Sequence, residues 1–136
     1  MQTLAGARGF TLVECLTACC MAALLVTLAV PAFRGHDFRA GRLDAVEALT
    51  RVQVAQEQHR NAHGLYAGDL QALLGVSGRS PQGRFSIAVT LTGPQSYQAT
   101  ASAMGPQTGD QGCARITLSV QQGYAQIGPN AGCWLR

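Results

Sequence analysis

Residues 10–33 read FTLVECLTACCMAALLVTLAVPAF, an apolar run of 24 residues that contains a single charged side chain, Glu14. A helix rises about 1.5 Å per residue, so a helix of this length spans about 36 Å, more than the bilayer's hydrocarbon core of about 30 Å. A carboxylate inside a membrane is costly and usually marks a functional site. The run therefore predicts a membrane-spanning helix with a functional acid near its start.

Two simpler interpretations of the same run explain less of it. Residues 28–32, LAVPA, form a loose small-residue cleavage site, as at the end of a secretory signal peptide. The apolar region of such a peptide is only about 7–15 residues long and should carry no carboxylate. A plain membrane anchor would have the observed length, but it gives Glu14 no role.

The residues at the start of the run resemble a known processing site. Residues 9–14, GFTLVE, are similar to the cleavage motif of type IV prepilins, in which a short basic leader ends in Gly before Phe-Thr-Leu-hydrophobic-Glu and an apolar helix. The resemblance implies that residues 1–9 are a leader peptide. It also implies that a membrane aspartyl peptidase, the prepilin peptidase, cuts between Gly9 and Phe10 and methylates the new amine of Phe10.

The same resemblance assigns roles to other positions of the helix. Glu14 is expected to act in assembly, with the Phe10 amine of a neighbouring subunit as the partner proposed for the family. Pro31 falls where many family members have proline, which implies a helix kink. The chain departs from the family at Ala23, where many pilins have glycine. Because alanine is the better helix former, loosening of the helix between Ala23 and Pro31 is less favoured here.

Charge placement and the family resemblance disagree about membrane orientation. Arg34, Arg39 and Arg42 follow the apolar run, whereas Arg8 alone precedes it. The positive-inside rule would therefore place the C-terminus in the cytoplasm. The resemblance instead implies a single pass through the inner membrane of a Gram-negative bacterium, with a periplasmic head that is later carried on an extracellular pilus. We follow the resemblance, because dedicated machinery reads short leaders of this kind.

Residues 34–136 form the predicted head, which is long enough for one small core. Its first segment, RGHDFRAGR at 34–42, has poor helix propensity and predicts a bend or local weakness. From 42 to 62, apolar residues return at helical spacing and predict an amphipathic helix that ends near Gly64. Its expected buried stripe is Leu43, Val46, Leu49 and Val52, and its expected solvent face is Asp44, Glu47, Arg51, Gln53, Glu57 and Arg60, with Glu47 placed to pair with Arg51.

The remainder of the head alternates apolar and polar residues, a pattern typical of strands with one buried face. The predicted strands are residues 84–91, 97–103, 114–120 and 124–127, with turn-rich sequence at 93–94 and 105–112. Asp69 is placed to cap a short helical turn that ends at Gly75. We therefore predict an α+β fold, in which a long N-terminal helix packs on a three- or four-stranded antiparallel sheet.

This order of elements again resembles type IV pilins, so the resemblance covers the whole chain in outline. Residues 61–75 and the terminal Cys133-Trp134 are similar to minor pilins of the PilE kind. By the topology that the resemblance implies, Cys113 and Cys133 are exported, and they are expected to pair in an oxidising periplasm. Type IV pilins commonly carry one such C-terminal disulfide. The other cysteines, Cys15, Cys19 and Cys20, lie in the membrane helix and are expected to pack as small apolar residues.

The sequence offers little for catalysis or cofactor binding. His59 and His63 are four residues apart on the predicted helix, a spacing that could hold a metal, with Glu57 and Asp69 near in sequence. A solvated helix end is the better interpretation, since no third ligand is obvious. We find no Walker loop, no Ser-His-Asp grouping and no paired carboxylates, so we predict neither an enzyme nor a cofactor or metal site.

Composition also limits the function classes. The net charge is +3 and charged residues make up only 12% of the chain, which argues against a histone-like binder that depends on many phosphate contacts. We predict a minor pilin, a structural subunit that supports adhesion, twitching motility or DNA uptake. Its expected partners are major and minor pilins, the prepilin peptidase and the inner-membrane assembly platform.

Two alternatives remain open at this point. One is a pseudopilin of a type II secretion system, which shares the leader and helix; the cysteine pair and the lack of an acidic calcium loop favour a pilin. The other is a competence pilin that binds DNA. Its candidate basic patch is Arg79, Arg84, Arg115 and Arg136, with Tyr97, Tyr124 or Trp134 for stacking. Four scattered arginines are more often a solvated surface, so their position on one face of the head would discriminate.

Overall fold

The computed structural model describes residues 9–134, apart from the side chains at positions 32 and 34. Leader residues 1–8 and Arg136 of the predicted patch lie outside the described residues. The chain divides after His36 into two units, which we describe separately. The elements are α1 (Leu12–His63), β1 (Phe85–Gly93), β2 (Ser96–Ala103), β3 (Arg115–Gln121), β4 (Tyr124–Gly128) and two short 3-10 helices, η1 (Gly105–Gly109) and η2 (Ala131–Trp134).

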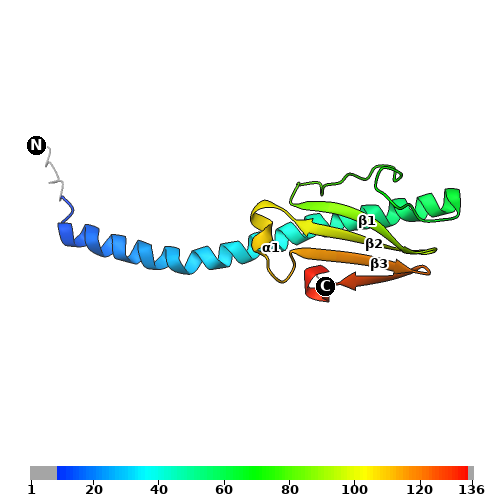
Figure 1. Ribbon diagram of the computed structural model, residues 1–136. Helices are drawn as coiled ribbons and strands as arrows, with labels where there is room; N and C mark the ends of the chain where they lie inside the picture. Colours follow the sequence, from blue (N-terminus) through cyan, green and yellow to red (C-terminus); the bar gives the residue numbers. More distant parts are fainter. Residues whose placement is uncertain (1–8, 135–136) are drawn as a thin grey trace, which may run out of the picture. The chain divides into compact units, whose positions relative to one another are not determined.

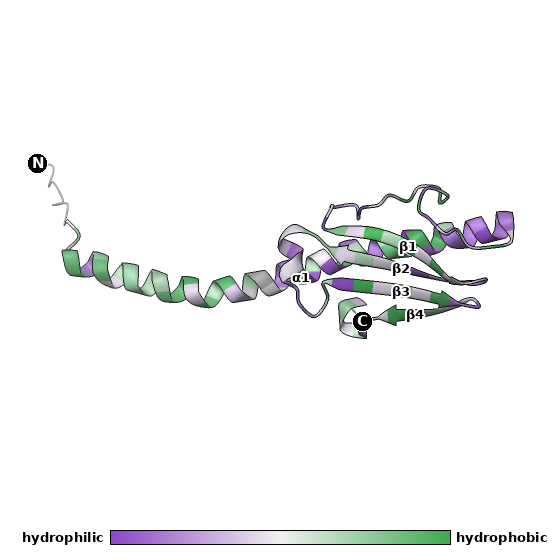
Figure 2. Cartoon of the chain, in the orientation of Figure 1, coloured by the Kyte–Doolittle hydropathy of each residue, from purple (hydrophilic) through white to green (hydrophobic). Residues whose placement is uncertain are grey.

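The first unit consists of the N-terminal part of α1. Most of its residues are apolar, as the green ribbon in Figure 2 shows. Its large apolar side chains are exposed. This part of α1 is long and apolar enough to cross a membrane, with a mean hydropathy of 2.2 and none of it buried. The finding agrees with the membrane-spanning helix predicted over residues 10–33.

The helix is not interrupted at residues 34–42, where the sequence predicts a bend or weakness. Tertiary contacts in the second unit offset the low helix propensity of this segment. Asp37 pairs with Arg84 at 3.2 Å, and Arg42 pairs with Asp110 at 2.7 Å. The side chains that looked unfavourable for a helix therefore hold it to the head.

The second unit contains a four-stranded antiparallel sheet whose strands follow one another in the order β1-β2-β3-β4 (Figure 1). The four strands match the predicted segments to within about two residues at each end. The register pairs Val89 with Ala99 and Ala99 with Leu118, so apolar positions of neighbouring strands face the same side. The predicted α+β fold is confirmed.

The core lies between this side of the sheet and the C-terminal part of α1. On α1 it is formed by Ala45, Ala48, Leu49, Val52 and Ala55, whose small side chains let the helix approach the strands. The predicted stripe is wrong at Leu43, which is 57% exposed. A strict spacing of three residues drifts around the helix, because each residue turns about 100° and only alternating steps of three and four stay on one face.

Asp44 corrects the predicted solvent face, because it is buried with only 1% of its surface exposed. Its carboxylate accepts hydrogen bonds from the Ser80 hydroxyl and from the backbone N–H groups of Gln82 at 2.8 Å and Arg84 at 3.3 Å. A buried carboxylate is tolerated when donors surround it. Asp44 thus fixes the turn that leads into β1 against the helix.

A second polar contact attaches the connection that follows α1. The side-chain amide of buried Gln56 donates to the Ala67 carbonyl at 2.9 Å and accepts from the Ala67 N–H at 2.8 Å. The helix ends at His63 as predicted, and Gly64 takes a φ of +79°. Residues 69–75 form turns and not the predicted short helix, although the Asp69 carboxylate does cap the Ala72 N–H at 3.0 Å.

Candidate functional site

The start of α1 places Glu14 in a reciprocal cap with Thr11. The Glu14 carboxylate accepts from the Thr11 N–H at 2.9 Å and the Thr11 hydroxyl at 3.0 Å, while the Thr11 hydroxyl accepts from the Glu14 N–H at 3.3 Å. This is a capping box. Sequence analysis missed it, although the signal, Thr followed three residues later by Glu before an apolar run, lies inside the prepilin-like motif itself.

The other predicted positions of the N-terminal segment are exposed on the isolated subunit. Phe10 precedes the helix and is mostly exposed, and Pro31 lies inside α1. The three membrane-helix cysteines are free and exposed as well. The described part of this unit is an apolar helix with an acid near its N-terminus and an exposed surface. Such a helix is suited to packing against lipid or other helices.

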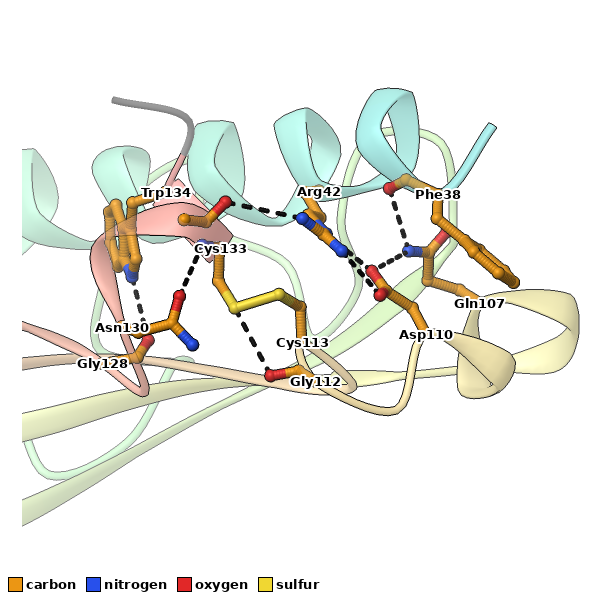
Figure 3. The surroundings of a disulfide bond; sticks show 11 residues. Phe38, Arg42, Gln107, Asp110, Gly112, Cys113, Gly128, Asn130, Cys133 and Trp134 are labelled. Atoms are coloured by element: carbon orange, nitrogen blue, oxygen red, sulfur yellow. Dashed lines mark hydrogen bonds and ion pairs between the residues drawn. A yellow bond between two sulfur atoms is a disulfide. The ribbon is translucent and has the colours of Figure 1, made fainter. Parts of the chain in front are cut away.

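At the other end of the chain, Cys113 and Cys133 form the expected disulfide, with their Cα atoms 5.5 Å apart (Figure 3). The bond joins the loop before β3 to η2. The Cys133 N–H also donates to the Asn130 side chain at 3.2 Å, and the Trp134 indole donates to the Gly128 carbonyl at 2.9 Å. These contacts fold the C-terminal residues back onto the sheet edge.

Arg42 connects α1 to both sides of this disulfide (Figure 3). Its guanidinium makes two 2.7 Å hydrogen bonds to the Asp110 carboxylate and approaches the Gly132 carbonyl at 3.5 Å. The hydrogen bonds to Asp110 raise the pKa of Arg42. Gln107 adds a 3.2 Å bond to the Phe38 carbonyl, and a side chain at Gly41 would overlap the Gln107 amide. The disulfide region is therefore attached to the helix at several points.

The histidine pair does not form a metal centre in the part of the chain that the structure describes. The rings of His59 and His63 stack with centroids 4.2 Å apart, and His63 Nδ1 lies 3.1 Å from the His59 carbonyl. Glu57 is engaged elsewhere, accepting from the Tyr66 hydroxyl at 2.9 Å. Among the described residues, no three His, Cys, Asp or Glu side chains gather to hold a metal ion.

The structure disperses part of the predicted basic patch. Arg84 is paired with Asp37. Tyr97 is completely buried, so its assignment as a stacking residue is wrong; the alternation of β2 points it into the core. Trp134, the last residue of η2, is partly buried against the core, and its indole donates to the Gly128 carbonyl of β4.

Arg79 and Arg115 are brought together by strand register. Arg79 forms an isolated antiparallel bridge with Ser86, Ser86 pairs with Ser102 of β2, and Ser102 pairs with Arg115 of β3. Directly paired residues project to the same side of a sheet. Both arginines therefore lie in one row, on the face opposite the core. We call Arg79, Ser86, Ser102 and Arg115 the arginine row.

A known family matches this chain. The family described as type IV minor pilin ComP, DNA uptake sequence receptor, matches residues 31–117. No curated protein matches the chain. The matched region holds the second part of α1, β1, β2 and the start of β3, and it excludes residues 9–14. The match and the prepilin-like motif are therefore independent observations from different parts of the molecule.

Proposed function

Because the chain belongs to the type IV minor pilin ComP, DNA uptake sequence receptor family, we propose that it is a pilus subunit whose head binds DNA during uptake. Membership supports the minor pilin over the pseudopilin of a secretion system. It also supports a structural and recognition role and not catalysis. This function has three parts: processing, assembly and DNA binding.

Processing is the first part of the proposal. The prepilin peptidase cuts after Gly9 and methylates Phe10, and α1 then holds the subunit in the inner membrane of a Gram-negative bacterium with its head in the periplasm. The exposed, apolar surface of the first unit supports this residence. Mass spectrometry of the membrane-extracted protein should show an N-methylated Phe10 as the first residue. An intact Met1, or a start near Phe33, would contradict it.

Assembly is the second part. Extraction from the membrane into a filament exchanges lipid for neighbouring helices, so the apolar surface of α1 stays covered. The Glu14 carboxylate already has two donors from Thr11, which makes the acid easier to hold in an apolar setting. It retains acceptor capacity for the Phe10 amine of a neighbour. That ion pair forms only when subunits dock in register, and it favours correct packing.

DNA binding is the third part, and the family membership is the observation that carries it. DNA binding is also supported by where the acidic and basic residues lie in the protein. Five of the seven acidic residues lie on α1 and the other two in loops, so the four strands carry no acid. Arginine is the only charged residue in the strands, at position 115. A surface with arginine and no carboxylate attracts phosphate.

A deletion strain tests the function as a whole. Loss of the gene should lower natural transformation and the retention of duplex DNA on cells, while pili sheared from the strain remain near the wild-type amount. Complementation with the wild-type gene should restore both readings. Normal transformation in the deletion strain would contradict the DNA-binding role. Loss of all pili together with transformation would assign the chain to filament initiation and not to DNA capture.

A further inference from the structure

The outer face of the sheet has an unusual composition for an exposed surface. Its positions alternate with the core positions of β1–β4 and are mostly serine, threonine and glutamine. Examples are Ser102, Thr100 and Gln98 on β2, with Thr117 and Ser119 beside them on β3. Nearly all of them are able to donate a hydrogen bond. The face is polar, and within residues 9–134 the two arginines of the arginine row are the charges that we place on it.

The positive charge of the arginine row is not neutralised locally. Four of the seven arginines whose side chains are described make ion pairs, namely Arg42, Arg51, Arg60 and Arg84. Arg79 and Arg115 make none among the described residues, and both are exposed. The acidic residues are held on α1 and in the loops at 69 and 110. Arginines without carboxylate partners are available to an anionic ligand.

The spacing of the row suits a polyanion. Three steps between neighbouring strands of about 4.8 Å separate the backbones of Arg79 and Arg115 by about 14 Å. Duplex DNA carries one negative charge per about 1.7 Å of its axis, so both arginines reach separate phosphates of one duplex. Arginine, serine, threonine and glutamine side chains are common donors to phosphate oxygens.

The aromatic content of the face favours double-stranded over single-stranded DNA. Proteins that bind single strands stack successive bases on several aromatic side chains. This face has one exposed aromatic residue, Tyr124, which is 78% exposed and pairs with Gln121 at the corner far from the arginine row. The middle of the face is formed by short polar side chains. Such a surface is able to contact a duplex backbone but offers no row of stacking positions.

We propose that the outer sheet face is the surface on which this head holds the sugar–phosphate backbone of duplex DNA, with Arg79 and Arg115 each contacting a phosphate. The proposal rests on the DNA-binding function proposed above and assigns it to a surface. Backbone contacts of this kind position the duplex and carry no sequence information. They are therefore expected for any duplex, with base recognition added by other parts of the protein.

Salt dependence provides a direct count of the phosphate contacts. The full chain, in nanodiscs of uncharged lipid, is titrated with a labelled 20-base-pair duplex at several salt concentrations. The logarithm of the association constant falls linearly with the logarithm of the salt concentration, and each lost phosphate contact should make this negative slope shallower by about 0.9. Arg79→Gln and Arg115→Gln should each make the slope shallower by about one, and the double variant by about two. Arg115→Lys keeps the charge and should retain the wild-type slope.

Arg39→Gln is the matched control. Arg39 is exposed, lies on α1 and forms no ion pair among the described residues, so its substitution removes the same charge without touching the sheet. Its slope should stay at the wild-type value. Because all three arginines are exposed, the variants should keep the wild-type melting temperature, which is checked on the same samples.

The outcomes separate this surface assignment from the general function. If the wild-type chain binds no duplex, the DNA-binding function itself fails. If the wild-type chain binds but the double variant keeps its slope, the DNA site lies elsewhere and the present proposal is wrong. An equal slope change in Arg39→Gln would show that only total charge matters and would also overturn it. Stronger competition by single-stranded than by duplex DNA would overturn the assignment to a duplex.

Discussion

The guanidinium of Arg42 and the carboxylate of Asp110 meet in a two-pronged ion pair, with both nitrogen–oxygen distances at 2.7 Å. The two residues are 68 positions apart, and Asp110 is only 6% exposed. Paired hydrogen bonds in a partly buried setting are the strong form of this interaction. The contact attaches α1 to the loop that carries Cys113, so the helix and the C-terminal disulfide should loosen together.

Asp110→Asn is expected to destabilise the head by about 2–3 kcal/mol. The substitution removes the charge opposite a partly buried guanidinium and weakens both hydrogen bonds. Urea unfolding of the purified chain, followed by tryptophan fluorescence, measures the change. A loss below about 0.5 kcal/mol would show that the pair contributes no more than a surface contact.

The Glu47–Arg51 pair is the control for this variant. It has a similar distance, 2.6 Å, but both side chains are more than half exposed on α1. An exposed pair of this kind contributes only about 0.3–0.5 kcal/mol. Glu47→Gln should therefore leave the unfolding midpoint nearly unchanged.

Tyr97→Phe is expected to stabilise the protein by about 1 kcal/mol. The Tyr97 hydroxyl is buried and has no hydrogen-bond partner among the described residues, and leaving such a group unpaired costs about 1–3 kcal/mol. Phenylalanine keeps the ring and its edge contact with Tyr66, whose centroid lies 4.8 Å away. Tyr66→Phe is the opposite control, because it removes a hydroxyl bonded to Glu57 and Arg60 and should destabilise.

The dependence of folding stability on alkaline pH provides a second test of the burial of Tyr97. Burial, followed by the nearby Tyr66 and Glu57, raises the pKa of Tyr97 above the usual value near 10. The unfolded chain therefore loses this proton at lower pH than the folded chain, and stability present below pH 10 should fall above it. Tyr97→Phe should show a smaller fall between pH 10 and 12. An equal fall in both proteins would contradict the burial of this hydroxyl.

Removal of the disulfide should cost about 3 kcal/mol in the chain-entropy model, given its sequence separation of 20 residues. A Cys113→Ser, Cys133→Ser double variant and the reduced wild-type chain should unfold at the same denaturant concentration. The double variant should not respond to reductant, because Cys15, Cys19 and Cys20 are unpaired in the isolated subunit. A further shift of the variant in reductant would show that other cysteines form bonds.

Glu14→Ala should impair assembly and leave the head intact. The residue belongs to the first unit, and within the described part of the chain its hydrogen bonds go to Thr11 and to its own turn of the helix. We expect normal membrane amounts and normal processing, but less protein in sheared pili. The protein is quantified in both fractions by immunoblot.

Thr11→Ala separates two effects of the Glu14 substitution. It removes the hydroxyl of the capping box but leaves the carboxylate available to a neighbour. If the acid acts through subunit docking, Thr11→Ala should assemble better than Glu14→Ala. Equal defects in the two variants would assign the role to the helix cap.

The fold could be predicted because its signals are local. Period-two alternation located all four strands, and Gly64 located the end of α1. The errors came from tertiary contacts, which no local pattern records. Asp44 looked like a surface residue, yet Ser80 and the turn after it supply its donors from 36 or more positions away. The helical state of residues 34–42 depends in the same way on Asp110 and Arg84.

The candidate sites also differ in whether a local sequence signal or a tertiary contact determines them. The disulfide was predictable because only two cysteines lie outside the membrane helix. The arginine row was not, since it depends on the register between three strands and the segment before them. The predicted stacking role of Tyr97 conflicts with the alternation of its own strand, which places it with Ala99 and Ala101 in the core.

The contact between Gln56 and Ala67 has a consequence for how this protein can change through evolution. Both hydrogen bonds go to the main chain of residue 67, so neither depends on the side chain that it carries. The connection beyond it, residues 68–78, contains no helix or strand and is largely exposed. One glutamine thus anchors the segment without constraining its exposed positions. Leu73 is buried in the core, and Leu70 and Val76 pack against it, so these three are constrained by packing. Mutations at the exposed positions cost folding little, which leaves those positions available for diversification among related strains.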